Sequence, residues 1–194
     1  MNAHDVIKAW DEAGPKHIHP SRGVSEEAYW ASGEQTAHQL AEVLKPGWRV
    51  VDFGVGDGRV AIPLRRLGFE VTGADASPTM LTALAGNDPG LPQVQTDGSD
   101  LYAQLGHKAD AVVCLAVLIH HGRASVLTIL DGLCKAVRKG GLLILDWPTS
   151  AHPEEAQIWI DVTTWDPDVQ QAEAAKRGLK RVEGDHPWAV FRKS

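Results

Sequence analysis

The chain has 194 residues, of which 43% are hydrophobic and 23% charged, and its formal net charge is −6. This composition is typical of one folded domain and excludes a disordered chain. The 25 acidic residues outnumber the 19 basic ones, and no long Lys/Arg run is present. The balance argues against binding to nucleic acid or to an anionic membrane surface, since both depend on basic side chains.

The first residues lack the basic start and long apolar run of a signal peptide, and no apolar run approaches the length of a membrane span. Cys114 and Cys134 lie in apolar surroundings, with neither a disulfide framework nor a metal-ligand spacing. We therefore expect a cytoplasmic protein that does not contact the membrane and holds no metal.

The N-terminal part is predicted to be helical. A short helix within 1–14 precedes a loop punctuated by prolines and glycine, and a longer helix covers 25–44. Ser32 and Gln35 have the spacing of a capping box, so this helix could break and restart near Ser32. The sequence "KPGW" ends it.

Strands and helices then alternate along the chain. Strands are predicted at 48–53, 69–75, 92–97, 109–118 and 142–147. Helices are predicted at 59–68, 77–86 and 124–141. Ser77 and Pro78 provide a cap and a first-turn proline for the second helix, and Gly140 provides a C-cap for the third. Alternation of this kind indicates a parallel sheet with helices on both faces.

The last segment, 179–194, reads as two strands joined by a turn at 184–187. An antiparallel hairpin is a permitted edge of an otherwise parallel sheet. The predicted fold class is therefore α/β, a doubly wound, mostly parallel, seven-stranded Rossmann-like sheet with a C-terminal antiparallel hairpin.

The stretch "VVDFGVGDGRVAIPLRRLGFEVTGAD" places Gly54, Gly56 and Gly58 between the first strand and its helix. In a doubly wound sheet this turn lies at the carboxyl ends of the strands, where ligands bind. Asp75 ends the next strand and is suitably spaced to accept hydrogen bonds from ribose hydroxyls. The sequence thus predicts a cofactor of the adenosine type.

The glycine spacing differs from that of nicotinamide-binding and P-loop proteins. The nicotinamide pattern G-x-G-x-x-G would need glycine where Arg59 stands, and no G-K-S/T follows. The sequence "VVDFGVGDG" instead resembles the first motif of class I S-adenosylmethionine-dependent methyltransferases. The resemblance continues in order through "GADASPTML", "QTDGSDL", "ADAVVCLAVLIHH" and "VRKGGLLIL", over about residues 48–147.

The resemblance implies cofactor-binding roles. Asp52, Gly54 and Gly56 match residues around the methionine portion of S-adenosylmethionine. Asp75, followed by Ala76, matches the ribose-binding acid. Asp52 could in addition cap the turn by accepting hydrogen bonds from backbone N–H groups.

Later motifs imply further contacts. Asp97 matches the acid that accepts the adenine amine, and the Gly98 N–H would meet the ring, although "TDGSD" would form a turn in any protein. Leu115 and Ala116 stand where relatives offer backbone to the cofactor's amino group, and Leu115 replaces a residue that is often polar. Tyr29 could reach the cofactor carboxylate through its hydroxyl.

His120 and His121 follow the fourth strand, where relatives place a residue near the methyl group. The unperturbed pKa of histidine suits proton transfer near neutrality, so His120 is the candidate base. The alternative is that His120 only positions the acceptor or packs within the loop.

The family places N-terminal segments over the active site, which implies a helical cap over 1–45 and a Rossmann-like core over 46–194. His19 and Trp30 are then candidate acceptor contacts in the cap, and Trp147 is one after the fifth strand. Packing of helix against sheet is the alternative role of such tryptophans. His17 and His19 have no third ligand at a recognised metal spacing, so we predict no metal site.

The resemblance implies a methyltransferase that uses S-adenosylmethionine, releases S-adenosylhomocysteine and methylates O or N of a small molecule, as a monomer or homodimer. Motifs of DNA-methylating enzymes are absent, since "CLAV" follows the fourth strand where amino-methylating DNA enzymes have D/N-P-P-aromatic. The alternatives are a cofactor-binding accessory subunit that needs a partner, a protein or RNA methyltransferase and, more remotely, a nicotinamide oxidoreductase.

Overall fold

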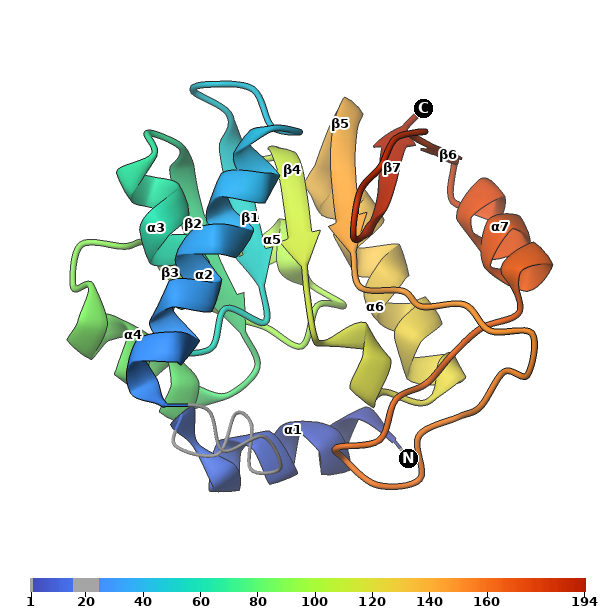
Figure 1. The fold of residues 1–194 in the computed structure, drawn as a ribbon, viewed down its shortest axis with the longest axis horizontal. Helices are drawn as coiled ribbons and strands as arrows, with labels where there is room; N and C mark the ends of the chain where they lie inside the picture. Colours follow the sequence, from blue (N-terminus) through green and yellow to red (C-terminus); the bar gives the residue numbers. More distant parts are fainter. Residues whose placement is uncertain (1, 16–24) are drawn as a thin grey trace.

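The computed structural model of the chain describes residues 2–15 and 25–194 and contains one seven-stranded sheet (Figure 1). The strand order is β3-β2-β1-β4-β5-β7-β6. Strands β1 to β5 pair in parallel, and β7 pairs antiparallel with both β5 and β6. The fold class predicted from the sequence is thus confirmed. The strands are β1 (Arg49–Phe53), β2 (Glu70–Asp75), β3 (Gln93–Gln95), β4 (Ala109–Cys114), β5 (Val137–Leu145), β6 (Leu179–Arg181) and β7 (Ala189–Lys193).

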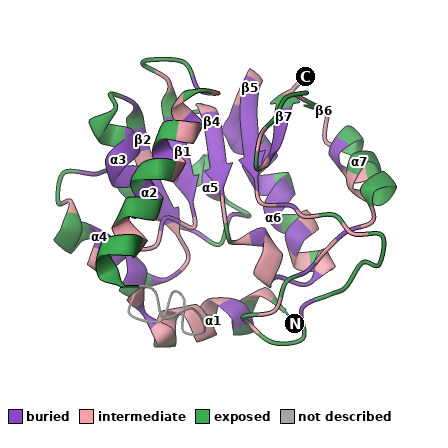
Figure 2. Cartoon of the chain, in the orientation of Figure 1, coloured by how far each residue is buried: buried purple, intermediate pink, exposed green. Residues whose placement is uncertain are grey.

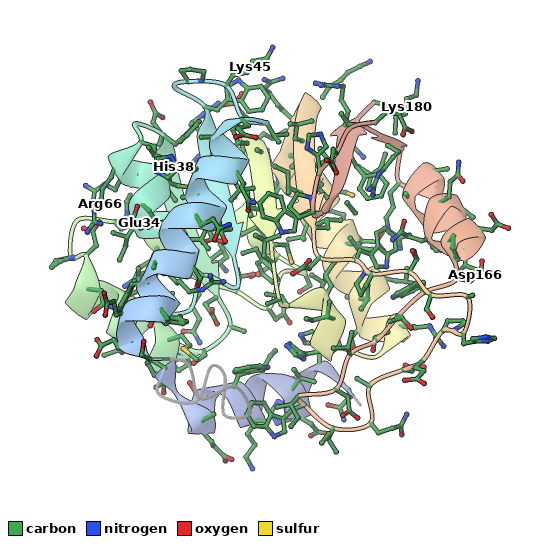
Figure 3. All side chains as sticks on the ribbon, in the orientation of Figure 1. Glu34, His38, Lys45, Arg66, Asp166 and Lys180 are labelled. Carbon is green, nitrogen blue, oxygen red and sulfur yellow. The ribbon has the colours of Figure 1, made fainter. Side chains whose placement is uncertain are left out.

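Helices cover both faces of the sheet and bury its strands between two hydrophobic clusters (Figure 2). One cluster joins the sheet to α2, α3 and α4, and the other joins it to α5, α6 and α7. The side chains of Glu34 on α2 and Arg66 on α3 point toward one another (Figure 3), with 3.0 Å between Oε1 and Nη1. The helices are α1 (Ala3–Ala13), α2 (Glu26–Ala41), α3 (Ala61–Arg66), α4 (Pro78–Asn87), α5 (Leu101–Leu105), α6 (Arg123–Ala136) and α7 (Pro167–Lys176).

The predicted starts of α2 and α4 are confirmed, and the possible break near Ser32 is absent. Ser25 caps α2, and Ser77 caps α4 with Pro78 in its first turn. Helix α2 runs without interruption past Ser32, whose hydroxyl donates to the carbonyl oxygen of Tyr29 at 2.6 Å. Because that hydroxyl bonds back into its own helix, it does not start a new one.

The predicted end of the helix in 124–141 is also wrong. Helix α6 ends at Ala136, and β5 begins at once with Val137, which has φ −83° and ψ 137°. Val137 pairs with Ala109 of β4, and the register then shifts before Ala111. Tertiary pairing with β4 therefore takes residues 137–141 out of the helix, and Gly140 lies within the irregular start of β5 instead of capping α6.

Two helices, α5 and α7, were not predicted. Helix α7 has a recognisable start, since Asp166 accepts from the backbone N–H groups of Asp168 and Val169 and Pro167 follows at the first helical position. Helix α5 has five residues and no side-chain cap, so its sequence carries no comparable signal.

Helix α1 lies across the carboxyl ends of the parallel strands (Figure 1). Two hydrogen bonds join α1 to the start of α4. The Asp11 carboxylate accepts them from the Ser77 hydroxyl at 2.6 Å and from the Thr79 N–H at 3.1 Å. Among the helices of residues 2–15 and 25–194, none is long and apolar enough to cross a membrane.

Candidate active site

A pocket of about 400 Å³ lies at the carboxyl ends of the strands. The segments that follow β1, β2, β4 and β5 line it, and α1 and α2 contribute Trp10 and Tyr29. Its titratable lining residues are Asp52, Asp75, Asp97, Asp146, Tyr29, Arg59, His120 and His121. The elements that were far apart in the sequence thus meet around one cavity.

The turn after β1 opens the pocket to a ligand. Gly54 has φ 79°, and a Cβ at this position would overlap the side chain of Val117. Gly56 has φ 56°, and a Cβ there would meet no atom within 4 Å. Both positions favour glycine for conformational reasons, and the backbone at Gly56 faces open space in which a ligand can approach closely.

The Asp75 carboxylate is fixed at the end of β2. Its Oδ2 accepts from the Gly56 N–H and its Oδ1 accepts from the Ser77 N–H, both at 2.9 Å. Burial raises the pKa of Asp75, and these two N–H groups oppose that rise. Since a carboxylate has about four acceptor sites, each oxygen can still accept a bond from a ligand hydroxyl.

Asp52 is the last residue but one of β1 and is buried beside the glycine turn. Burial raises its pKa to about 7, while the positive charge of Arg59 lowers it and the nearby Asp75 carboxylate adds to the rise. This carboxyl therefore exchanges its proton near neutral pH, inside the pocket.

Arg59 brings a positive charge into the pocket. Its guanidinium lies 5.5 Å from the centre of the Tyr29 ring, and its Nη1 donates to the Ser32 hydroxyl at 3.0 Å. The Tyr29 hydroxyl donates to Oδ1 of the buried Asp57 at 2.7 Å. Burial and the Asp57 carboxylate both raise the pKa of Tyr29, so this side chain keeps its proton as a hydrogen-bond donor.

Asp97 lies on the pocket wall, whereas Gly98 is not among the lining residues. The Asp97 Oδ1 accepts from the N–H and the hydroxyl of Ser99, at 2.9 and 2.6 Å. The Gly98 N–H donates to the Thr96 hydroxyl oxygen at 3.0 Å. The predicted N–H contact from Gly98 to a cofactor ring would therefore compete with this internal bond.

The exit of β4 carries a strained residue at the pocket. Ala116 has φ 56°, an uncommon conformation for a residue with a Cβ, and its N–H donates to the Asp146 Oδ2 at 3.0 Å. Leu115, Ala116 and Asp146 all line the pocket, and burial raises the pKa of Asp146. The backbone at this exit is thus held by an acid from the end of β5.

His120 and His121 both line the pocket but differ in setting. The His120 Nδ1 lies 3.0 Å from the carbonyl oxygen of Asp161, and its ring packs against Trp10 with 5.4 Å between centres. His121 is 4% exposed, and burial lowers its pKa to about 4. The His121 ring is therefore neutral near pH 7, and its Nδ1 has no hydrogen-bond partner among the described residues.

Of the three remaining sequence candidates for acceptor binding, the two that the structure describes, Trp147 and Trp30, do not line the pocket. Trp147 is 3% exposed and packs in the core against Trp165 and Phe191, so its placement corresponds to the packing alternative. Trp30 packs beside the cluster on the α2 face of the sheet. His19 lies outside the described residues.

Several residues of the pocket wall were not among the sequence candidates, and Arg59, Asp146, Ile160 and Val162 are four of them. Arg59 directly follows the glycine motif, which is a usable signal. The other three lie at or after the end of β5, where only the fold brings them to the pocket. Within 2–15 and 25–194 no group of three or more metal-ligating side chains is present.

Comparison with known proteins gives consistent results. Residues 51–145 match the family model described as a methyltransferase domain. A ubiquinone biosynthesis O-methyltransferase of Methylobacterium sp. (strain 4-46) is 34% identical over 142 residues, which are 69% of this chain and 55% of that protein. A magnesium-protoporphyrin O-methyltransferase of Synechocystis sp. is 41% identical over 85 residues, 39% of this chain and 34% of that protein. The chain thus spans about half the length, or less, of these curated relatives.

Solved structures agree on the fold. The crystal structure of magnesium protoporphyrin IX methyltransferase from Synechocystis PCC 6803 with bound S-adenosylmethionine superposes with a TM-score of 0.66 at 20% identity. The match covers 98% of this chain and 97% of that one. The chain therefore contains a methyltransferase domain over residues 51–145, and its fold is that of solved S-adenosylmethionine-dependent methyltransferases.

Proposed function

We propose that the chain binds S-adenosylmethionine in this pocket and transfers its methyl group to a hydroxyl oxygen of a small molecule. The observation that carries the proposal is the acidic character of the lining, in which four Asp side chains, Asp52 with a pKa near 7 among them, face one guanidinium, that of Arg59. A cofactor with a sulfonium, an ammonium and one carboxylate has a net positive charge and suits such a lining. A dinucleotide with two phosphates does not.

Each part of the cofactor has a complementary group in the pocket. Arg59 would hold the carboxylate, and Asp52 would face the positively charged end. Asp75 would accept from the ribose hydroxyls, and Asp97 from the adenine amine. Met80 and Phe53 add apolar lining.

The bound cofactor supplies a methyl group on positively charged sulfur. His120 would receive the acceptor's proton. Because the Asp161 carbonyl oxygen can only accept, its contact with His120 requires the proton on Nδ1, and in the neutral ring Nε2 is then the basic nitrogen. The Nε2 of His120 would take the hydroxyl proton while the acceptor's oxygen takes the methyl group that the cofactor would supply.

The names of the matched relatives support oxygen as the atom methylated, since those proteins are O-methyltransferases. The proposal also includes a cap over 1–45 and a core over 46–194, with α1 over the strand ends in support. We further propose that the acceptor is a small molecule, that the protein is a monomer or homodimer, and that it is located in the cytoplasm. Cys114 and Cys134 are free thiols, as is usual in a reducing compartment.

Calorimetric titration with S-adenosylhomocysteine, with NADH as the control ligand, tests the cofactor. Micromolar binding of the first alone is expected, and absence of that binding would mean that a partner must complete the site. A screen of small phenols, catechols and amines with labelled S-adenosylmethionine then tests the acceptor. Transfer to a protein or an RNA, with no small molecule methylated, would favour the alternative function.

His120→Asn separates base catalysis from positioning. We expect it to lower kcat for a hydroxyl acceptor by about 10²- to 10⁴-fold while the affinity for S-adenosylhomocysteine stays within about twofold. His107→Asn, outside the pocket, is the matched control.

A further inference from the structure

The segment after β5 carries an unusual group of exposed apolar side chains. Ile158, Ile160 and Val162 are 51%, 42% and 44% exposed. Six large hydrophobic residues are exposed in the described part of the chain, and these three fall within five consecutive positions. Single exposed apolar residues are common on protein surfaces, whereas a contiguous group at the edge of a pocket marks a binding surface. We call these three residues the apolar lip.

The apolar lip is continuous with the proposed acceptor side of the pocket. Ile160 and Val162 are themselves pocket-lining residues, together with Ile7, Trp10 and Ile119. The polar groups described above cluster around the glycine turn and the ends of β1, β2 and β5. Apolar side chains thus lie next to His120 in the pocket, with the Trp10 ring packed against its imidazole.

Hydrogen bonds hold the apolar lip in place. The Asp161 carboxylate accepts from the N–H groups of Gln157 and Ile158, at 3.0 and 3.1 Å, and the Asp161 N–H donates to the Ile158 carbonyl. The Trp159 ring packs edge-on against Trp10 of α1, with 4.8 Å between centres. This segment is an ordered turn, so its apolar side chains are presented to solvent by a defined structure.

The same turn is joined to the proposed base. The Asp161 carbonyl oxygen bonds to the His120 Nδ1, and the Thr163 N–H donates to the Ile119 carbonyl at 2.6 Å. The buried Thr163 hydroxyl donates to the His121 carbonyl at 2.7 Å. A molecule whose hydroxyl reaches His120 would therefore have its opposite end beside the apolar lip.

We propose that the methyl acceptor is amphiphilic, with a hydroxylated head group at His120 and an apolar tail lying on Ile158, Ile160 and Val162. This inference rests on the proposed function, because it names the acceptor class of the same site. Covering these side chains removes apolar surface from water and so favours longer tails.

The test uses a homologous series of probes. 4-Ethylphenol, 4-butylphenol and 4-hexylphenol are titrated calorimetrically into the full chain, with and without saturating S-adenosylhomocysteine. Complete burial of one methylene group strengthens binding about fourfold, so a tail buried on one side is expected to gain about twofold per methylene. The series would then span about 16-fold in Kd.

In the double variant Ile160→Ser/Val162→Ser, the Kd should lose most of its dependence on tail length. The double variant Leu67→Ser/Val169→Ser is the matched control, because these side chains are 40% and 47% exposed and lie outside the pocket lining. The conservative double variant Ile160→Leu/Val162→Ile, which keeps apolar side chains at both positions, should show the same dependence of Kd on tail length as the wild type.

A wild-type Kd that does not change with tail length overturns the inference, as does a dependence that survives in the Ile160→Ser/Val162→Ser variant. Sedimentation of the wild type as a dimer and of that variant as a monomer would assign the apolar lip to a second copy of the chain instead. Failure of the proposed function is distinguished by the S-adenosylhomocysteine titration. The dependence of Kd on tail length is measured both with and without S-adenosylhomocysteine, so it can be determined even if the protein does not bind that ligand.

Discussion

The carboxylate of Asp75 serves both the fold and the proposed cofactor site, since the Gly56 and Ser77 N–H groups already bond to it. We expect Asp75→Ala to weaken S-adenosylhomocysteine binding by about 1–3 kcal/mol, or roughly 5- to 150-fold in calorimetric Kd. The loss combines a missing ribose acceptor with a loosened glycine turn. Asp88→Ala, which removes a surface partner of Arg65, should leave the Kd unchanged. An unchanged Kd for Asp75→Ala would contradict the assignment.

Because Asp52 is buried, we expect its carboxyl to make the free energy of unfolding depend on pH. Its carboxyl ionises near pH 3.8 in the unfolded chain but, because of burial, has a pKa of about 7 in the fold. Between these values the folded state binds the extra proton, so the free energy of unfolding falls as pH rises and levels off above about 7. Asn at this position does not titrate, so the stability of Asp52→Asn relative to wild type should rise over that range by up to about 4 kcal/mol.

Urea denaturation of wild type and Asp52→Asn at about pH 5 and about pH 8 should show roughly 3 kcal/mol of this change, since about two pKa units of the interval lie above pH 5. Asp88→Asn is the control with a pKa shifted the other way, since a hydrogen bond from Arg65 lowers the pKa of Asp88. That carboxyl is ionised in both states over this range, so the difference between Asp88→Asn and wild type should stay constant. A constant difference for Asp52→Asn as well would mean that Asp52 is not the titrating group.

At the scale of secondary-structure elements, helix α6 packs closely against the segment that follows β3. A Cβ on Gly132 of α6 would overlap the carbonyl of Gly98, next to Asp97. We expect Gly132→Ala to lower the free energy of unfolding by about 2–3 kcal/mol, because the helix must move away from a packed backbone. Since Asp97 lies on the pocket wall, S-adenosylhomocysteine binding should weaken as well.

Gly86→Ala on α4 is the matched helix variant. A Cβ there would meet no atom within 4 Å. Alanine favours the helix over glycine, so Gly86→Ala should raise the free energy of unfolding by about 0.5–1 kcal/mol. Chemical denaturation of both variants checks the pair. Equal effects would show that the clash at Gly132 is relieved at no cost.

The boundary between α6 and β5 shows that local helix signals do not by themselves determine where a helix ends. Residues 137–141 follow an amphipathic helix and include basic residues and glycine, which are typical of a helix C-terminus. In the fold, Val137 instead pairs with Ala109. A long-range partner therefore overrides a local signal, and the sequence alone does not give its position.

At the scale of the whole molecule, the pocket lies at the carboxyl ends of the parallel strands, and both hydrophobic clusters include residues of this sheet. A ligand bound there should stabilise the entire chain. At about 100 times its Kd, S-adenosylhomocysteine adds about 2.7 kcal/mol to the free energy of unfolding, which corresponds to a rise in Tm of roughly 5–10 °C. NADH at the same concentration should give no shift. Differential scanning calorimetry measures both, and an equal shift with NADH would contradict the charge argument for the pocket.

The sequence by itself determined the alternation of strands and helices, the seven-stranded sheet with its reversed last strand, and the glycine turn with Asp52 and Asp75. These features are local: hydrophobic periodicity, caps and glycine spacing are set by neighbours along the chain. The order of the motifs also indicated the family, which the matched domain at 51–145 then supported.

Only the tertiary structure decided which side chains share the pocket. Asp146, Ile160 and Val162 line the pocket, whereas Trp147 is buried in the core. These residues come from segments whose meeting point depends on the strand order and on the path of the loops, which no local pattern encodes. The pKa of Asp52 follows for the same reason, because burial is a property of the assembled fold and not of the sequence around one residue.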